Sequence, residues 1–360
     1  MHESQCLTYI HLHILKGVDA RTTQDWPALF FFPLNTDLRP TDATIDTLAS
    51  WAKLRASSRK SFPPPSHFST DDIPDLTGRI ALVTGGNAGI GKETVRALLE
   101  HNATVYLAAR SRDKAEAAIA ELKESTGKEA RFIRCDLASL KSVRDAAAQF
   151  LTKESELHIL FNNGGVLNPP MDQLTVEGLD LQWGVNCVGP FLLTTLFLSA
   201  LLYGAKSSPD GKSRVVNTSS IAAYGDVIHW DSFKPGKARD RMGALRLYMQ
   251  SKHADVVFAR ELGRRYGESI VSTAVNPGNI RTTLYRHYPS VLERILFLSM
   301  YSPQKGALTQ LWAGTSPETV DFNGKFLIPF ARVGECRAEA DDPEIGKRLW
   351  EYFEDVTQEH

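Results

Sequence analysis

Short apolar runs rich in β-branched residues alternate with segments of helical spacing along most of the chain. The pattern predicts strands at residues 79–85, 103–110, 130–137, 157–165, 214–220 and 270–278. Strands that alternate with helices predict βαβ units and a parallel sheet with helices on both faces. Right-handed crossovers make such a sheet doubly wound, so we expect one main α/β domain.

The first part of the chain does not share this alternation. Residues 1–61 contain one amphipathic stretch, and Pro63, Pro64 and Pro65 then favour an extended chain. We therefore expect residues 1–61 to be a poorly ordered or irregular extension, or to come from an upstream start codon. The α/β domain is expected at residues 62–360.

The composition excludes several classes of partner. Lys plus Arg is 41 and Asp plus Glu is 42, so the chain lacks the basic excess of a nucleic-acid-binding protein. No apolar run reaches the ~18 residues of a transmembrane span, and the histidines show no metal-ligand spacing. We expect a cytoplasmic protein, with peripheral membrane contact as the alternative. The cysteines form no C-x-x-C pair, which indicates reduced thiols: Cys6, Cys135, Cys187 and Cys336.

A glycine-rich turn, Thr84-Gly-Gly-Asn-Ala-Gly-Ile-Gly91, joins the first predicted strand to the helix that follows. Glycines allow the backbone to turn tightly and let a pyrophosphate approach closely. Free N–H groups at the start of the helix favour the phosphates. We expect this turn to bind a dinucleotide, and a glycine turn without a ligand is the alternative. The expected binding residues are Gly85, Asn87, Gly89, Ile90 and Gly91.

The ends of the next two strands bear on which dinucleotide binds. An acidic residue after the second strand would bond the ribose 2′-hydroxyl of NAD, but the sequence there is Ala108-Ala109-Arg110-Ser111. The planar guanidinium of Arg110, assisted by Arg112, suits a 2′-phosphate, so NADP(H) is favoured over NAD(H). A solvated surface arginine is the alternative. After the third strand, the carboxylate in Asp136-Leu137 either accepts from the adenine amino group or caps a helix.

Tyr248 and Lys252 stand four residues apart in a helix-like run, so their side chains share one face of the helix. A phenol with a pKa of about 10 is a poor base near neutral pH. A neighbouring ammonium stabilises the phenolate and lowers that pKa. Taken alone, the pair is either ordinary packing or an acid/base with the charge that tunes it.

The motifs, in their order along the chain, resemble those of the short-chain dehydrogenase/reductase family. The resemblance covers roughly residues 62–345 and is strongest to the retinol-dehydrogenase-like branch, especially its fungal members. It implies a Rossmann fold and an NAD(P)-dependent oxidoreductase that acts on CH–OH groups. The motifs are the glycine turn, Asn162-Asn163-Gly164-Gly165, Ser219-Ser220, Tyr248-x-x-x-Lys252 and Pro277-Gly278.

The resemblance implies catalytic roles for four residues. Tyr248 is then the general acid/base, and Lys252 lowers its pKa and holds the nicotinamide ribose. Ser220 hydrogen-bonds the substrate oxygen, with strand-end capping as its alternative. Asn186 supports a water relay to the lysine, with a structural contact at a helix kink as its alternative.

The resemblance also implies further contacts with the cofactor. Asn162 corresponds to the strand-end asparagine that ties the central sheet together and borders the cofactor. Pro277-Gly278 begins a loop over the nicotinamide, in which Ile280 meets the carboxamide through its backbone. Thr282 touches the phosphates or the amide. A plain Pro-Gly turn is the alternative.

Two later segments concern the substrate. The segment between Ser220 and Tyr248 is long, which is typical of functional loops, and its aromatic residues are candidates to line a pocket. Residues 282–301 are strongly apolar and are expected to form a helical lid over an apolar carbonyl or alcohol, with a dimer or membrane-surface contact as the alternative. The pocket candidates are Tyr224, His229 and Trp230.

In the family, the helices that correspond to residues 190–202 and 248–263 commonly pack against a second copy. This predicts a homodimer, with a membrane-attached monomer as the alternative.

Three functions are compatible with the fold that the resemblance implies. The first is an NADP(H)-dependent oxidoreductase, and the second is a sugar-nucleotide epimerase or dehydratase, which the spacing of Gly85, Gly89 and Gly91 opposes. The third is a non-enzymatic dinucleotide sensor, which the full set of catalytic residues opposes.

Overall fold

The structure, a computed structural model, describes residues 65–281 and 300–358. These residues belong to one compact unit, Leu38–His360. The expected extension at residues 1–61, Thr282 and residues 282–299 of the expected lid lie outside the described ranges.

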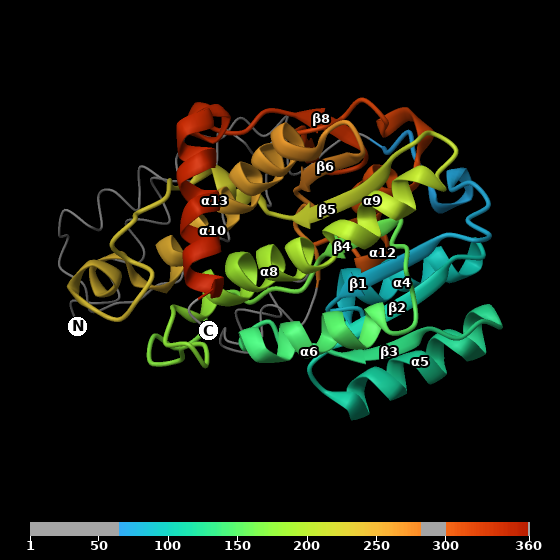
Figure 1. Ribbon diagram of the computed structural model, residues 1–360, viewed down its shortest axis with the longest axis horizontal. Helices are drawn as coiled ribbons and strands as arrows, with labels where there is room; N and C mark the ends of the chain where they lie inside the picture. The colour runs from blue at the N-terminus through green and yellow to red at the C-terminus, as the bar shows by residue number, and fades with distance from the viewer. Residues whose placement is uncertain (1–64, 282–299, 359–360) are drawn as a thin grey trace, which may run out of the picture. The chain divides into compact units, whose positions relative to one another are not determined.

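An eight-stranded sheet in the order β3-β2-β1-β4-β5-β6-β7-β8 forms the centre of the domain (Figure 1). Neighbouring strands are parallel from β3 to β7, and β8 alone pairs antiparallel with its neighbour. This order confirms the predicted doubly wound α/β fold. The strands are β1 (Ile80–Thr84), β2 (Thr104–Ala109), β3 (Arg131–Arg134), β4 (Ile159–Asn162), β5 (Ser213–Thr218), β6 (Ile270–Val275), β7 (Phe326–Ile328) and β8 (Arg332–Gly334).

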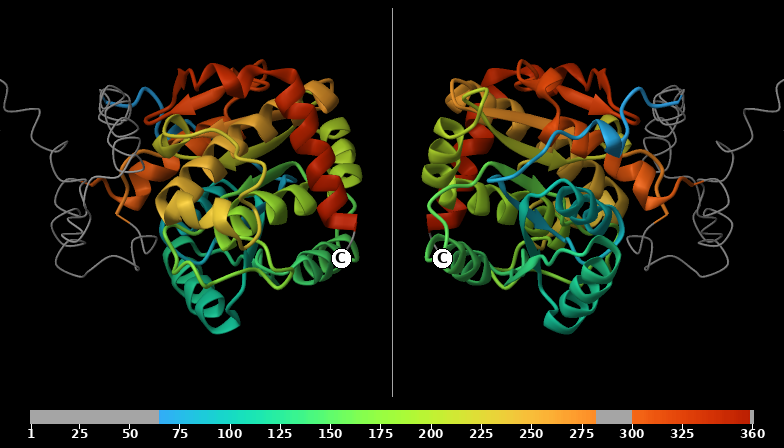
Figure 2. Two further views of the ribbon diagram at one scale, coloured as in Figure 1. Left: turned by 90° about the vertical axis from the view of Figure 1, so that its left-hand side faces the viewer. Right: turned by 90° about the vertical axis from the view of Figure 1, so that its right-hand side faces the viewer.

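Helices cover both faces of the sheet (Figure 2). One layer packs on the core that contains Ala81 and Val83, and it consists of α4 (Gly89–Glu100), α5 (Arg112–Thr126) and α12 (Pro303–Thr315). The other layer packs on the core that contains Leu82, and it consists of α6 (Leu140–Leu151), α8 (Gly189–Leu196), α9 (Leu198–Lys206), α10 (Lys237–Tyr266) and α13 (Pro343–Gln358). Shorter helices are α7 (Leu181–Trp183), the π-helix η3 (Gly184–Val188), and the 3₁₀ turns η2 (Thr70–Asp72), η4 (Ile221–Tyr224), η6 (Pro317–Thr319) and η7 (Ala338–Asp341).

Alternate residues of each central strand point into opposite cores, because successive side chains on a strand face opposite sides of the sheet. Leu82 of β1 packs in one core, while Ala81 and Val83 pack in the other. A strand buried on both faces therefore reads as a largely apolar run, which explains why the sequence predicted β1, β2, β4, β5 and β6. The edge strand β3 is partly exposed, and its prediction rested on its place in the alternation of strands and helices. The three-residue strands β7 and β8 are too short to show any period, and the sequence did not predict them.

The sheet order places the functional edge. The chain moves outward in one direction from β1 to β2 and β3, then crosses back to β4 and moves in the other direction. The connections after β1 and β4 therefore separate at the carboxyl ends of these strands, which is where open α/β sheets bind ligands.

No single helix in the described ranges is long and apolar enough to cross a membrane, although the bent pair Leu181–Leu196 and Leu198–Lys206 passes that test together.

The C-terminal helix α13 packs across α8 and α10 (Figure 1). Phe353 is fully buried, with its ring 5.0 Å from that of Phe191 on α8. Trp350 also lies 5.0 Å from Phe191 and 6.1 Å from Phe258 on α10. The apolar faces of α8 and α10 that the sequence analysis offered to a second copy are thus occupied in part by a helix of the same chain.

We predict that Phe353→Ala lowers the free energy of unfolding by about 3–5 kcal/mol, because a buried aromatic ring leaves a cavity between α13 and α8. The measurement is denaturant unfolding. Tyr203→Ala is the control, because Tyr203 is 54% exposed and its loss opens no cavity. Equal effects of the two variants would show that α13 does not stabilise the domain in this way.

Candidate functional site

The glycine turn between β1 and α4 adopts a conformation that only glycine accommodates without strain. Gly85 and Gly89 have φ of 65° and 53°, in the left-handed region. A Cβ on Gly91 would lie 2.4 Å from the Gly85 carbonyl oxygen. Asn87 and Ile90 are half-buried within the turn. The first residues of α4 have no side-chain cap, so their N–H groups suit the phosphates of a dinucleotide.

The loop after β4 packs against this turn. Thr84 Oγ1 accepts hydrogen bonds from the N–H groups of Asn163 at 3.0 Å and Gly164 at 2.9 Å. Gly164 lies so close to the turn that a Cβ on Gly85 would come within 3.0 Å of its Cα. The ends of β1 and β4 are therefore held together as one edge.

Asn162, the last residue of β4, ties the centre of the sheet together. Its Nδ2 donates to Asn217 Oδ1 on β5 at 2.9 Å and to Thr194 Oγ1 on α8 at 3.0 Å. The side chain is 4% exposed. These contacts match the structural part of the role that the resemblance implied for this residue.

The residues expected around the adenosine end lie at the carboxyl ends of β2 and β3. Arg110 is exposed and makes no ion pair with the described residues. Arg112 instead pairs with Glu116 at 3.1 Å, so its side chain is already engaged. Asp136 is half-buried and accepts from the N–H of Ala138 at 3.0 Å.

The first turn of α6 decides between the two interpretations of Asp136. Ser139 caps that helix, accepting from the N–H of Ser142. The interpretation of Asp136 as the helix N-cap is therefore wrong, because the helix begins after Ser139. Leu137 is buried and packs beside Gly164, on the inner side of this edge.

Tyr248, Ser220 and Lys252 come together where β5 ends. Tyr248 is 7% exposed, and its hydroxyl interacts with the side chain of Ser220. Lys252 Nζ donates to the carbonyl of Thr218, the last residue of β5, at 2.9 Å. The ammonium lies 5.9 Å from the centre of the Tyr248 ring. The structure thus brings together the three residues that the sequence analysis placed in the acid/base machinery.

Burial and charge act in opposite directions on this group. Burial raises the pKa of Tyr248, and the Asp255 carboxylate adds to the rise, while the Lys252 ammonium and Ser220 act to lower it. Burial acts to lower the pKa of Lys252, but Asp255, Tyr248 and Cys187 together outweigh burial, and the pKa is raised. Lys252 therefore stays charged and acts on Tyr248 in the expected direction, although burial of the phenol has the larger effect.

Asn186 lies in the π-helix η3 and is fully bonded. Its Oδ1 accepts from Val166 N at 2.9 Å, and its Nδ2 donates to Val166 O at 3.1 Å and to Ser251 Oγ at 2.9 Å. A Cβ on Gly165 would lie 3.1 Å from Asn186 Oδ1 and 3.8 Å from Lys252 Nζ. Asn186 is thus next to the lysine, and it also makes the structural contact that was its alternative role.

The Pro277-Gly278 loop follows β6. Gly278 has φ of 91°, and its N–H donates to Asn276 Oδ1 at 3.0 Å. Ile280 is buried and forms a parallel bridge with Tyr301, which holds the loop against the residues before α12.

The segment before α10 is anchored by two polar groups that the sequence analysis did not single out. Asp226 Oδ1 pairs with His229 Nε2 and Asp226 Oδ2 with Arg246 Nε, both at 2.8 Å. Gln250 Oε1, fully buried on α10, accepts from His229 N at 3.1 Å. His229, one of the pocket candidates, is therefore held by its bonds to Asp226 and Gln250.

The other two pocket candidates also make structural contacts. Tyr224 donates its hydroxyl hydrogen to Glu335 O at 2.6 Å. The ring of Trp230 lies 6.1 Å from that of Phe233 and is covered by Arg348 of α13 at 4.0 Å. A further residue absent from the predictions, Gln310 of α12, is fully buried between the glycine-turn helix and β5. No spacing in the sequence marks Gln250 or Gln310, because each bonds to residues far away along the chain.

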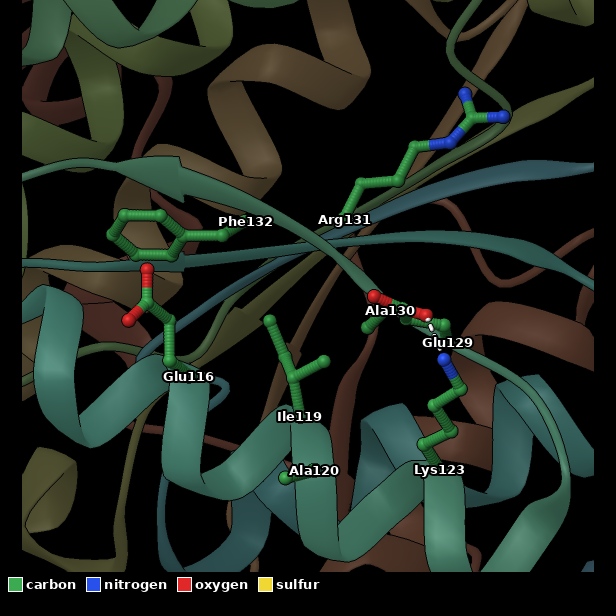
Figure 3. A pocket seen from close by; sticks show the side chains of 8 residues that line it. All are labelled: Glu116, Ile119, Ala120, Lys123, Glu129, Ala130, Arg131 and Phe132. Atoms are coloured by element: carbon green, nitrogen blue, oxygen red, sulfur yellow. Dashed lines mark hydrogen bonds and ion pairs between the residues drawn. The ribbon is translucent and has the colours of Figure 1, made fainter.

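A surface hollow lies between α5 and β3 (Figure 3). An ion pair between Lys123 and Glu129, at 2.6 Å, spans one side of it. None of the residues expected to bind cofactor or substrate lines this hollow, and its charged groups are surface pairs, so we assign no site to it. The lining consists of Glu116, Ile119, Ala120, Lys123, Glu129, Ala130, Arg131 and Phe132.

Asp226 provides a test of the anchored segment. Burial acts to raise its pKa, but hydrogen bonds from His229, Arg246 and the Val227 N–H outweigh burial and lower the pKa from 3.8 to about 2. A lowered pKa in the folded state stabilises the protein above the unfolded pKa near 4, and this contribution is lost as the pH falls through about 2. We predict that Asp226→Asn lowers the free energy of unfolding by about 2 kcal/mol at pH 7.

Denaturant unfolding at pH 7 measures this effect. The control is Asp145→Asn, which removes an exposed pair with Lys141 and is expected to change stability by less than about 0.5 kcal/mol. An Asp226 variant that is as stable as this control would show that the cluster does not hold the segment.

This chain is similar in sequence and in fold to several known proteins. A family model described as short chain dehydrogenase matches residues 79–291. A short-chain dehydrogenase/reductase of Armillaria gallica is 54% identical over 294 residues, covering 81% of this chain and 94% of that protein. Retinol dehydrogenase 11 of Mus musculus is 36% identical over 281 residues, covering 77% of this chain and 85% of that protein. A solved Shigella flexneri protein, described as a short-chain dehydrogenase complexed with NADP, shares the fold with a TM-score of 0.56 at 23% identity, covering 70% of this chain and 98% of that chain.

Proposed function

The chain belongs to the short-chain dehydrogenase/reductase family, and on that premise we propose that it interconverts a carbonyl and an alcohol on an apolar small molecule, with NADP(H) as cofactor. Family membership makes it an oxidoreductase that acts on CH–OH groups with a nicotinamide cofactor. The assignment of Tyr248 as general acid/base, the choice of NADP(H) and the apolar substrate are the proposal.

The loop after β4 links the two parts of the proposed site. The loop after β4 contacts the glycine turn at Gly164 and approaches Lys252 at Gly165. The turn suited to phosphates and the group of Ser220, Tyr248 and Lys252 therefore lie along one edge of the sheet. A dinucleotide whose pyrophosphate lies on the glycine turn would extend along this edge toward Tyr248. This arrangement supports redox chemistry at Tyr248, and the spacing of Gly85, Gly89 and Gly91 opposes an epimerase.

The proposed mechanism assigns proton transfer to the protein. When bound, the nicotinamide supplies hydride transfer, which leaves proton transfer and positioning to side chains. In carbonyl reduction, the Tyr248 hydroxyl donates its proton to the substrate oxygen, and the Ser220 hydroxyl donates a hydrogen bond to that oxygen. The Lys252 ammonium stabilises the phenolate that remains on Tyr248. In alcohol oxidation the same groups act in reverse.

The cofactor and substrate preferences have separate support. Arg110 is exposed at the end of β2 without an acidic partner among the described residues, which suits a 2′-phosphate. A structural neighbour is also described as complexed with NADP. An apolar substrate is supported by the apolar sequence of residues 282–301 and by a relative named for retinol.

We predict that Tyr248→Phe lowers the rate of NADPH-dependent carbonyl reduction by about 10²–10⁴, because the proton donor is lost. NADPH consumption is followed over a panel of ketones, aldehydes and quinones. Tyr203→Phe, at an exposed tyrosine on α9, is the control and keeps wild-type turnover. Cofactor binding without Tyr248-dependent turnover on any substrate would instead favour the binding-module function.

We predict that Arg110→Ala weakens NADPH binding about tenfold to hundredfold and leaves NADH binding nearly unchanged, because only NADPH carries the 2′-phosphate. Equilibrium titration of cofactor fluorescence measures both affinities. Arg112→Ala, which removes a guanidinium already paired with Glu116, is the matched control and has the smaller effect. An equal loss for the two cofactors in Arg110→Ala would contradict the assignment.

A further inference from the structure

A buried ion pair adjoins the proposed proton donor. Lys252 Nζ donates to Asp255 Oδ2 at 2.8 Å, in addition to its bond to Thr218 O. The side chains of Lys252 and Asp255 are each 7% exposed. Charges buried to this extent are screened much less than surface charges. The Asp255 carboxylate therefore acts directly on the ammonium beside Tyr248.

The chain holds its other buried aspartates differently. Asp180 and Asp226 each accept hydrogen bonds from backbone N–H groups as well as from an arginine. Among the residues that the structure describes, Asp255 has a single side-chain hydrogen-bond donor, Lys252 Nζ. A buried pair with so few hydrogen bonds gains little stability over an apolar replacement. The main effect of the carboxylate is therefore on the charge that Lys252 presents to Tyr248.

We propose that Asp255 is a positioning residue whose carboxylate holds the Lys252 ammonium at the end of β5 and offsets its charge, so that Tyr248 keeps its proton to higher pH. This inference rests on the proposed role of Tyr248. It adds a residue to that site whose function is to bias the phenol toward the protonated form.

Lys252 and Asp255 carry the dominant charges among the titratable groups around the pair. Cys187, from the π-helix, faces the pair, but burial raises the pKa of its thiol well above the ordinary range, so it is neutral. Burial raises the pKa of Asp255 to about 6, with Lys252 acting in the opposite direction. Asp255 is therefore ionised above about pH 7. Ser220, which contacts the Tyr248 hydroxyl from the end of β5, carries no charge.

The position of Asp255 on α10 sets the size of the effect. Residues seven apart lie on one face of a helix, about 10 Å apart along its axis. A unit charge at that distance, with an effective dielectric constant of about 20, shifts a pKa by about one unit. The anion of Asp255 acts to raise the pKa of Tyr248, because a nearby negative charge disfavours the phenolate.

A phenol that keeps its proton suits one direction of the reaction. Carbonyl reduction needs the protonated form of Tyr248, and alcohol oxidation needs the phenolate. Asp255 therefore extends the alkaline range of reduction, and its loss favours oxidation at lower pH.

The test compares wild type with Asp255→Asn and Asp255→Ser, two replacements that remove the charge. The first readout is the pH dependence of kcat and of kcat/KM for NADPH-dependent reduction. We expect the alkaline limb to move about one pH unit lower in both variants. The second readout needs no substrate: the near-ultraviolet absorbance of tyrosinate, taken as the difference between each protein and the same protein carrying Tyr248→Phe, titrates earlier in the variants by a similar amount.

Two controls separate this effect from a loss of structure. Asp255→Glu retains the charge and is expected to keep the limb within a few tenths of a unit of wild type. Glu261→Gln removes another buried carboxylate from α10, which pairs with Arg264 and Arg265 away from Tyr248, and does not move the limb. Thermal unfolding verifies that each variant is folded at the pH of measurement.

The outcomes distinguish this inference from the proposed function. If Tyr248→Phe is inactive but the limb and the tyrosinate titration of the charge-removing variants coincide with wild type, the role of Asp255 is overturned and the proposed function stands. A shift of the same size in Glu261→Gln would also overturn it, because the effect would then be structural. If Tyr248→Phe retains turnover, the proposed function fails, and with it the inference.

Discussion

The hydrogen bond from Lys252 Nζ to the carbonyl of Thr218 joins helix α10 to the end of β5, and the rest of the site depends on this junction. Two more buried bonds hold the same helical turn. Ser219 Oγ donates to the Lys252 carbonyl at 2.6 Å, and Asn186 Nδ2 donates to Ser251 Oγ at 2.9 Å. An unpaired buried polar group costs about 1–3 kcal/mol, so a rotation or slide of the helix would be expensive. These bonds fix the position of Tyr248, which lies one helical turn before Lys252, relative to β5.

The same helix organises the elements around it. The face that carries Lys252 meets β5 and the π-helix, while Gln250 is bonded to the segment that precedes α10. Phe258 lies against Trp350 of the C-terminal helix α13. One helix thus contacts the sheet, the substrate-side segment and α13, so its position depends on packing against all three.

The parts that the sequence predicted share a physical cause. The strands β1, β2, β4, β5 and β6 are buried on both faces, so they appear as largely apolar runs, and the glycine turn needs φ values that other residues resist. Tyr248 and Lys252 share a helix face, so their spacing was readable. The sequence did not predict β7 and β8, because three residues are too few to show the alternation of a strand. The interpretation of Asp136 as a helix N-cap was wrong, because Ser139 caps that helix.

The alternating α/β architecture, the family resemblance and the residue types available for proton transfer could be read from the amino-acid sequence, because these depend on local periodicity and short spacings. Which polar groups meet across the chain became visible in the folded domain, because these groups are far apart in the sequence. Thr218 accepts from Lys252, and Asn186 donates to the neighbouring Ser251, each from a separate element. The C-terminal helix α13 covers α8 and α10. The i, i+3 spacing of Lys252 and Asp255 is visible in the sequence, but the strength of their interaction depends on burial, which the sequence does not show. The same pair on an exposed face would contribute almost nothing to stability.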